Sequence, residues 1–191
     1  MSESPLTARF GDAGVPTSWG GLHGSALSLA LLAAAGQSNR PVLVVTASSH
    51  RAQVLQRDLE LLATSDLPVF LFPDHETLPY DPFSPHPDII SERLKTLSAL
   101  SRLERGVVLC PVASLMQRLP PSEYILQRSF RLCSGDRLAI EPFRTQLAHA
   151  GYESVEQVYQ TGQYAVRGSV VDLFPAGAPL PYRIDLFDEE I

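Results

Sequence analysis

Cysteine is scarce in this sequence, which contains only Cys110 and Cys133. Two isolated cysteines provide neither the paired spacing of a zinc site nor a disulfide framework. Cys110 lies in an apolar run that begins at Gly106, where a thiol acts as a small hydrophobic group. The cysteines therefore predict neither a metal centre nor a covalent cross-link.

Positive charge and long hydrophobic runs are also lacking. The net charge of −6 argues against a broad electrostatic grip on a nucleic-acid backbone, although a partner protein or a small local basic patch stays open. The longest apolar stretch, residues 27–35, is too short to span a bilayer, and the N-terminus has no signal-peptide pattern. We expect a soluble cytoplasmic protein with no membrane partner.

Apolar residues are plentiful, and strands alternate with helices in the first two thirds of the chain. Apolar residues make up 45% of the chain, and its length of 191 residues is enough for one large domain or two small ones. Apolar runs predict strands at 41–46, 69–72 and 107–110, the first buried on both faces. A first helix is expected at 26–35 and should end at Gly36. A second should follow an N-terminal cap at Ser48 or Ser49, and a third is expected at about 90–103. This alternation predicts an α/β domain with a parallel sheet.

Shorter segments begin near Pro120 and Pro121. Extended stretches are expected at 129–132, 155–159, 164–174 and 182–187, with a helix at 142–150 closed by Gly151. The last two extended stretches flank the turn-rich residues 175–181, which is typical of a β-hairpin with a longer loop. We therefore predict two domains, an α/β domain over residues 1–119 and a small α+β domain over 120–191.

A glycine-rich segment precedes the first expected helix and invites comparison with a phosphate-binding loop. That motif, G-x-x-x-x-G-K-[ST], needs a lysine for the outer phosphates and a hydroxyl for magnesium. With Gly21 first and Gly24 inside the loop, the last three positions are occupied by Ala26, Leu27 and Ser28. A helix N-terminus still attracts an anion weakly. We expect neither tight ATP binding nor hydrolysis and no cofactor; a plain glycine-rich turn explains the same residues.

A proline-rich segment at residues 72–94 carries several side chains that are metal ligands in other proteins. These are His75, Glu76, Asp81, His86 and Asp88. Their spacing matches no defensible ligand pattern, so no metal site is expected. The alternative is a rigid, proline-stiffened loop that ends in a helix cap at Asp88 or Ser91.

Residues 76–94, E-T-L-P-Y-D-P-F-S-P-H-P-D-I-I-S-E-R-L, resemble the signature of Mfd, the bacterial transcription-repair coupling factor family. Residues 111–118, 147–152 and 164–175 are similar to the same family. The resemblance to the repair protein UvrB is more distant. UvrB has an intact phosphate-binding loop and, around the position of Tyr80, a longer aromatic hairpin that inserts into DNA; both are missing here.

The resemblance implies a fold and a role. The fold would be UvrB-like: a degenerate P-loop-like α/β domain without an ATP site, followed by a small α+β domain with a β-hairpin that docks UvrA. Members of the family are ATP-driven DNA translocases that push stalled RNA polymerase off damaged DNA and recruit UvrA. Their motor and polymerase-binding parts would lie beyond residue 191. We therefore expect this chain to be a non-enzymatic piece of a longer protein.

Strand periodicity points to a docking face in the second domain. In residues 182–189, Ile184 and Leu186 are expected to face the core, which leaves Arg183 and Phe187 on the outer side. If Arg167 lies opposite Phe187, two arginines and an aromatic ring gather on one face, whereas a register slip of one residue undoes this. By similarity, these three positions contact UvrA in Mfd and UvrB. The resemblance adds Tyr164 and Gly168 as neighbours, although Gly168 also fits a bulge or a close backbone approach.

Three functions compete at this point. The first is an adaptor that docks UvrA, and the second is an ATP-dependent enzyme, which Leu27 in the lysine position disfavours. The third is direct binding of damaged DNA through stacking on Tyr80 and Phe83. The acidic net charge and the missing aromatic hairpin disfavour the third.

Overall fold

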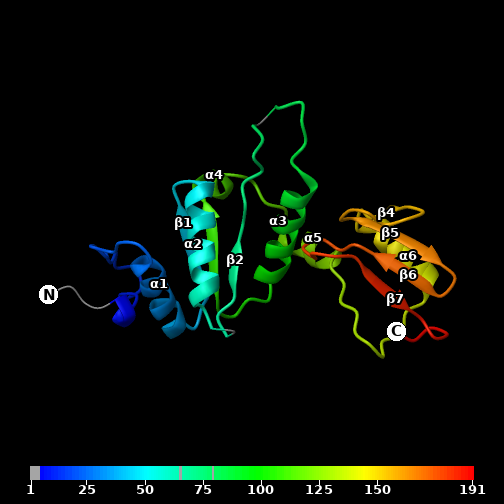
Figure 1. Cartoon of the computed structure of the whole chain (residues 1–191), viewed down its shortest axis with the longest axis horizontal. Coiled ribbons are helices and arrows are strands. Elements are labelled where there is room, and N and C mark those ends of the chain that lie inside the picture. The colour runs from blue at the N-terminus through cyan, green and yellow to red at the C-terminus, as the bar shows by residue number, and fades with distance from the viewer. Residues whose placement is uncertain (1–4, 65, 79) are drawn as a thin grey trace. The chain divides into compact units, whose positions relative to one another are not determined.

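The computed structural model describes residues 5–64, 66–78 and 80–191, and its contacts divide the chain into two compact units (Figure 1). The first unit comprises the chain up to Asp74 together with Arg102–Gln117. The second comprises His75–Ser101 together with Arg118–Ile191. Residues 75–101 thus cluster with the second unit rather than with the segments that flank them in sequence.

The first unit is built on a three-stranded parallel sheet in the order β1-β3-β2. The strands are β1 (Val42–Thr46), β2 (Val69–Leu71) and β3 (Val107–Pro111). The helices are α1 (Ala26–Gln37), α2 (Ser49–Leu62) and α4 (Val112–Leu115), preceded by the short 3-10 turn η1 (Pro5–Thr7). The predicted α/β class and parallel sheet are confirmed.

The core of this unit forms between the sheet and the helices α1 and α2. Strand β3 lies in the middle and is buried along its whole length. Ser48 caps α2 by accepting a hydrogen bond from the backbone N–H of Arg51 at 3.2 Å, as predicted. The apolar stripe of α2 then places Leu55 and Leu59 against Leu109 of β3 in one cluster. Burying each leucine contributes about 1.5–3 kcal/mol.

Two predictions for the first unit need correction. Strand β1 is not buried on both faces, because it lies at the sheet edge and leaves Leu43 and Val45 55% and 47% exposed. Gly36 does not end α1, which continues to Gln37. Arg105 donates hydrogen bonds to the carbonyls of Gly36 (2.6 Å) and Ser38 (3.1 Å), so a charged group satisfies the end of this helix.

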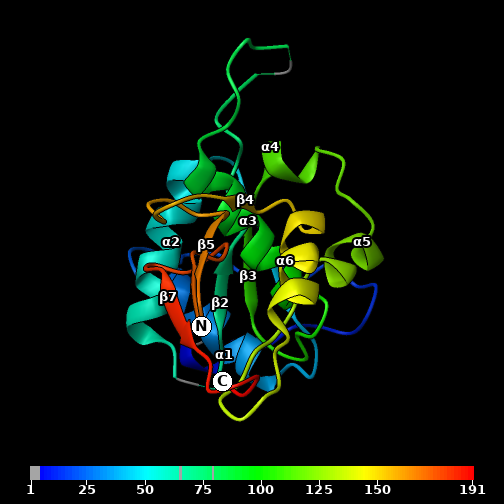
Figure 2. The ribbon, with the colours of Figure 1, turned by 90° about the vertical axis from the view of Figure 1, so that its right-hand side faces the viewer.

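The second unit contains a mixed four-stranded sheet in the order β4-β5-β6-β7. Its strands are β4 (Glu153–Ser154), β5 (Gln163–Arg167), β6 (Val170–Leu173) and β7 (Tyr182–Asp185), and its helices are α3 (Pro87–Leu100), α5 (Ser122–Gln127) and α6 (Ile140–His149). β4 and β5 are parallel, and the other pairs are antiparallel. Helix α6 lies along one face of the sheet (Figure 2), where Phe143 and Leu147 pack with Val171 and Ile184.

Helix α6 agrees with the expected helix at 142–150, and Gly151 follows it with a φ of 90°. The predicted strand at 129–132 is wrong. Those described residues form no strand, and Phe130 and Leu132 instead pack irregularly against the core. The stretch at 155–159 is likewise not a strand; the strand in this region is β4, which ends just before it at Ser154. Residues 164–174 are two strands rather than one, because the chain reverses at Gly168.

The cap of α3 also differs from the prediction. His86, not Asp88 or Ser91, is the N-cap, and its Nδ1 accepts a hydrogen bond from the N–H of Asp88 at 3.3 Å. Pro87 occupies the first helical turn, where its missing N–H costs nothing. The Ser91 hydroxyl instead accepts a 2.6 Å hydrogen bond from the N–H of Gly177, which ties the β6–β7 loop to α3. None of the helices in the described residues is long and apolar enough to cross a membrane.

Candidate protein-docking face

Strand pairing in the second unit sorts the side chains of β5, β6 and β7 onto two faces. Tyr164, Val171 and Ile184 point toward α6 and join the core. The intervening side chains lie on the opposite side, which we call the outer face. Its charged members are Arg167, Asp172, Arg183 and Asp185. The predicted inward direction of Ile184 and Leu186 is confirmed by exposures of 9% and 4%.

The register in which Arg167 would lie opposite Phe187, one of the alternatives that the sequence left open, is not formed. Arg167 lies opposite Val170, not Phe187, because the hairpin partner of β5 is β6. Strand β6 separates β5 from β7, so Arg167 and Arg183 lie on the outer face two strands apart. The two arginines share a face as expected, but an intervening strand contributes a side chain between them.

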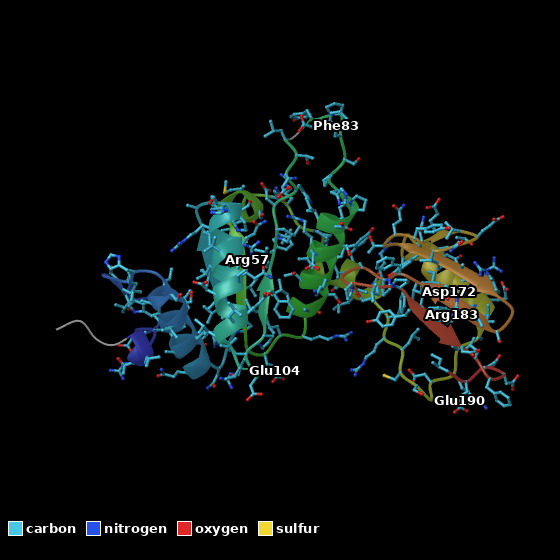
Figure 3. The ribbon with its side chains drawn as sticks, in the orientation of Figure 1. Arg57, Phe83, Glu104, Asp172, Arg183 and Glu190 are labelled. Carbon is cyan, nitrogen blue, oxygen red and sulfur yellow. The ribbon has the colours of Figure 1, made fainter. Side chains whose placement is uncertain are left out.

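That side chain is Asp172, which lies opposite Arg183 (Figure 3). The Nε and Nη2 atoms of Arg183 donate hydrogen bonds of 2.7 and 2.9 Å to the two carboxylate oxygens of Asp172. The Asp172 side chain is 17% exposed and that of Arg183 68%. The hydrogen bonds from Arg183 hold the pKa of Asp172 below its ordinary value, and the charge of Arg167 adds a smaller effect in the same direction.

Arg167 and Phe187 are held by backbone groups. The guanidinium of Arg167 donates a hydrogen bond to the carbonyl of Glu156, and its side chain is exposed. Phe187 and Glu190 exchange backbone hydrogen bonds of 2.9 and 3.1 Å around a turn in which Asp188 has a φ of 62°. Phe187 is 91% exposed and follows the end of β7 at Asp185.

Tyr164 and Gly168, the two proposed neighbours, have different positions. Tyr164 is only 4% exposed and belongs to the core on the inner face, so its ring is not part of the outer face. Its side chain hydrogen-bonds to Arg144, and this bond raises the pKa of Arg144. Gly168 has a φ of 60° and starts the two-residue turn between β5 and β6. No described atom lies within 4 Å of a Cβ added there, so a turn, not close approach, explains the glycine.

The glycine-rich segment lies immediately before α1. Gly21 and Gly24 have φ angles of 70° and 56°, and the helix begins at Ala26. Leu27, at the position of the motif's lysine, is an uncharged side chain that packs against the core of the first unit. Ser28 is 1% exposed, and its hydroxyl donates a 3.3 Å hydrogen bond to Asp58 of α2.

The loop before α3 exposes apolar side chains. Tyr80 is fully exposed and Phe83 78% exposed, with Phe83 near the loop tip (Figure 3). The Asp81 carboxylate accepts a 2.8 Å hydrogen bond from the N–H of Leu78, which fixes a local turn. Within residues 5–64, 66–78 and 80–191, no three acidic, histidine or cysteine side chains are grouped as a metal site requires.

Sequence reasoning missed Asp172 as a member of the outer face, although alternation along 182–189 already placed Asp185 on the side of Arg183. A signal for Asp172 was present, because it alternates with Val171 and Leu173 in a short β-branched run. That pattern directs Asp172 away from the core. Its pairing with Arg183 depends on the β6–β7 register, which the pattern does not contain.

Residues 130–191 match the UvrB interaction domain family. This segment includes α6, the whole β4–β7 sheet and the outer face, so the second unit carries a UvrB-like interaction domain.

The chain is similar over most of its length to transcription-repair-coupling factors. It is 47% identical to that of Haemophilus influenzae over 164 residues, which are 86% of this chain and 14% of the relative. For Escherichia coli the identity is 43% over 172 residues, 90% of this chain and 15% of the relative. For Bacillus subtilis the identity is 30% over 171 residues, which are 90% of this chain and 14% of the relative. The chain is a UvrB-like module of the transcription-repair-coupling factor family, and it spans only 14–15% of the length of these relatives.

Proposed function

We propose that the outer face docks UvrA, and that the module thereby recruits UvrA to lesion-stalled RNA polymerase in nucleotide excision repair. The main support is the arrangement of Arg183, which Asp172 holds on the outer face, together with the exposed side chain of Phe187 just beyond the end of β7. Arginine and aromatic side chains dominate the binding energy of protein interfaces. The match of residues 130–191 to the UvrB interaction domain family supports the same surface.

The charge of the outer face favours a protein as the partner. Its two arginines are balanced by Asp172 and Asp185, so the face has no net positive charge. A nucleic-acid backbone needs clustered cations that replace its counterions. A balanced pattern of charges is instead suited to the alternating charges of a protein surface.

The module itself would not hydrolyse nucleotide. Leu27 supplies no cation for a triphosphate, and the Ser28 hydroxyl is already bonded to Asp58. This is the basis for interpreting the first unit as a degenerate P-loop-like domain that acts as a scaffold. ATP-dependent translocation on DNA and contact with RNA polymerase would belong to the remainder of the longer protein.

Calorimetric titration of purified UvrA into this module tests the docking proposal. We expect Arg183→Ala and Phe187→Ala each to weaken binding by about thirtyfold, the usual effect of removing an interface hot spot. Arg167→Ala should also weaken it, because Arg167 is exposed on the same outer face.

Matched controls are available in the same unit. Arg131→Ala removes an exposed arginine outside the sheet, and Leu180→Ala removes an apolar side chain that is 71% exposed. Both should bind UvrA as the unmodified chain does. Undiminished binding of all three variants would place the UvrA site elsewhere.

Direct DNA binding is the second candidate, because Tyr80 and Phe83 are exposed in one loop. Exposed aromatic rings stack on unpaired bases. Fluorescence anisotropy with single-stranded and lesion-containing DNA tests this candidate at several salt concentrations. Salt-sensitive binding that is abolished in Tyr80→Ala and Phe83→Ala would favour it, whereas we expect no saturable binding.

A further inference from the structure

We infer that Asp172 is a positioning residue of the docking face, which holds Arg183 so that its outward guanidinium edge meets a carboxylate of the partner. This inference rests on the proposed docking of UvrA. It adds a residue to the site and specifies the chemistry of the group that Arg183 recognises.

The hydrogen-bond pattern of Arg183 defines which of its donors are used. A guanidinium has five N–H donors in a rigid plane. Nε and Nη2 donate to the two oxygens of Asp172 in a side-on pair. The two N–H groups of Nη1 and the second N–H of Nη2 point away from Asp172. They form the edge that a second carboxylate binds in the same bidentate manner.

Exposure and charge support this division of roles. The Asp172 side chain is largely covered, at 17% exposure, whereas that of Arg183 is 68% exposed. Asp172 is therefore poorly placed to contact a partner, and Arg183 is well placed. Arg183 also feels the negative charge of Asp185, although Asp172 has the larger effect. The donors that Asp172 does not use are available to an acceptor of the partner, and a carboxylate matches their planar fork better than a single carbonyl.

Pre-organisation is the expected contribution of Asp172. A free arginine side chain samples many rotamers, and fixing it on binding reduces affinity. Asp172 fixes the side chain before the partner arrives. Losing one such restraint should weaken binding by roughly two- to tenfold.

A double-mutant cycle on UvrA binding tests the inference. Asp172→Ala should weaken binding by roughly two- to tenfold in the unmodified chain and have no further effect in the Arg183→Ala background. Asp172→Asn, which keeps the shape of the side chain, should weaken binding by a smaller factor in the unmodified chain and again have no further effect in the Arg183→Ala background. A loss that persists in the Arg183→Ala background would mean that Asp172 contacts UvrA itself, and would overturn the inference.

A charge exchange separates positioning from mere support of the sheet. The double variant Asp172→Arg, Arg183→Asp rebuilds an ion pair across the same strands, so the thermal unfolding midpoint should recover toward that of the unmodified chain. UvrA binding should stay weak, because the outward donor edge at position 183 is gone. Full recovery of binding would mean that the pair only supports the sheet, and would overturn the inference.

The controls distinguish this inference from the docking proposal beneath it. Glu141→Ala breaks the exposed Glu141–Arg144 pair of α6 and should leave UvrA binding unchanged. If Arg183→Ala binds UvrA normally, the docking proposal fails. If Arg183→Ala is weakened but Asp172→Ala is not, docking stands and only the positioning role fails.

Discussion

The hydroxyl of Ser28 donates a hydrogen bond to the carboxylate of Asp58, 3.3 Å away on the neighbouring helix. Ser28 occupies the position where a phosphate-binding loop has its magnesium-coordinating hydroxyl. Here the side chain is buried and directed toward α2 instead of the loop. The side chains of the first turn of α1 therefore contact other residues of the first unit.

Restoring the lysine alone should therefore not create an ATP site. We expect Leu27→Lys, like the unmodified chain, to show no saturable binding of Mg-ATP by isothermal titration calorimetry. Ala26 still stands where the motif has glycine, and Ser28 stays bonded to Asp58. Micromolar affinity in the unmodified chain would contradict our interpretation of this segment.

Leu147 should be critical for the stability of the second unit. Its side chain is fully buried between α6 and the sheet. Leu147→Ala should lower the free energy of unfolding by about 2–5 kcal/mol, through lost burial and the cavity left behind. Urea unfolding followed by circular dichroism measures this. The control Leu180→Ala, at a site 71% exposed, should change the same free energy by no more than about 0.5 kcal/mol.

The turn between β5 and β6 should depend on Gly168. Its φ of 60° is available to glycine at little cost, and it is the first of the two turn residues. Gly168→Ala should destabilise the second unit by about 1–2 kcal/mol, the cost of a left-handed backbone for an L-residue. Ser169→Ala at the second turn position is the matched control. Equal midpoints for the two variants in thermal unfolding would show that the turn is not strained by a side chain.

The Asp172–Arg183 pair should make stability depend on pH. Because the pKa of Asp172 is lowered in the folded chain, its contribution is complete above the ordinary aspartate pKa of about 3.9. The contribution is lost as pH falls through the lower, folded pKa. The difference in unfolding free energy between the unmodified chain and Asp172→Asn should therefore be largest near neutral pH and shrink below about pH 4.

Urea titrations of both chains across this pH range measure that difference. Glu141→Gln serves as the control, because it removes a carboxylate from an exposed ion pair on α6, a type of pair that contributes about 0–1 kcal/mol. A difference for Asp172→Asn that is constant from neutral to acidic pH would show that the carboxylate's charge is not involved.

Local patterns predicted many of the elements in the structure. The capped apolar stripe of α2 and the buried run of β3 were found because their signals lie within a few neighbouring residues. The errors have a common origin in tertiary structure. β1 is apolar, yet it exposes Leu43 because it lies at the edge of the sheet. That edge position is set by the order of the strands, which no local sequence pattern contains. Residues 129–132 have a strand-like composition, but their described positions have no strand beside them, and they pack irregularly.

The candidate site divides in the same way. Alternation in 182–187 placed Arg183 outward and Ile184 inward, since neighbouring strand residues point to opposite faces whatever lies beside them. Alternation did not reveal that β6 lies between β5 and β7, nor that Tyr164 is in the core. The position of Tyr164 depends on α6 covering that face, which involves residues distant in the chain.

The sequence by itself determined the residue types that matter: a leucine where a phosphate-binding loop needs a lysine, and two arginines on strands with a definite inward side, the second followed by a phenylalanine. Only the tertiary structure decided that Asp172 pairs with Arg183 and that Ser28 bonds to Asp58. Covalent neighbours set which way a side chain points along a strand or helix. Which group it meets depends on strand order and register, and these arise when segments far apart in the chain pack together.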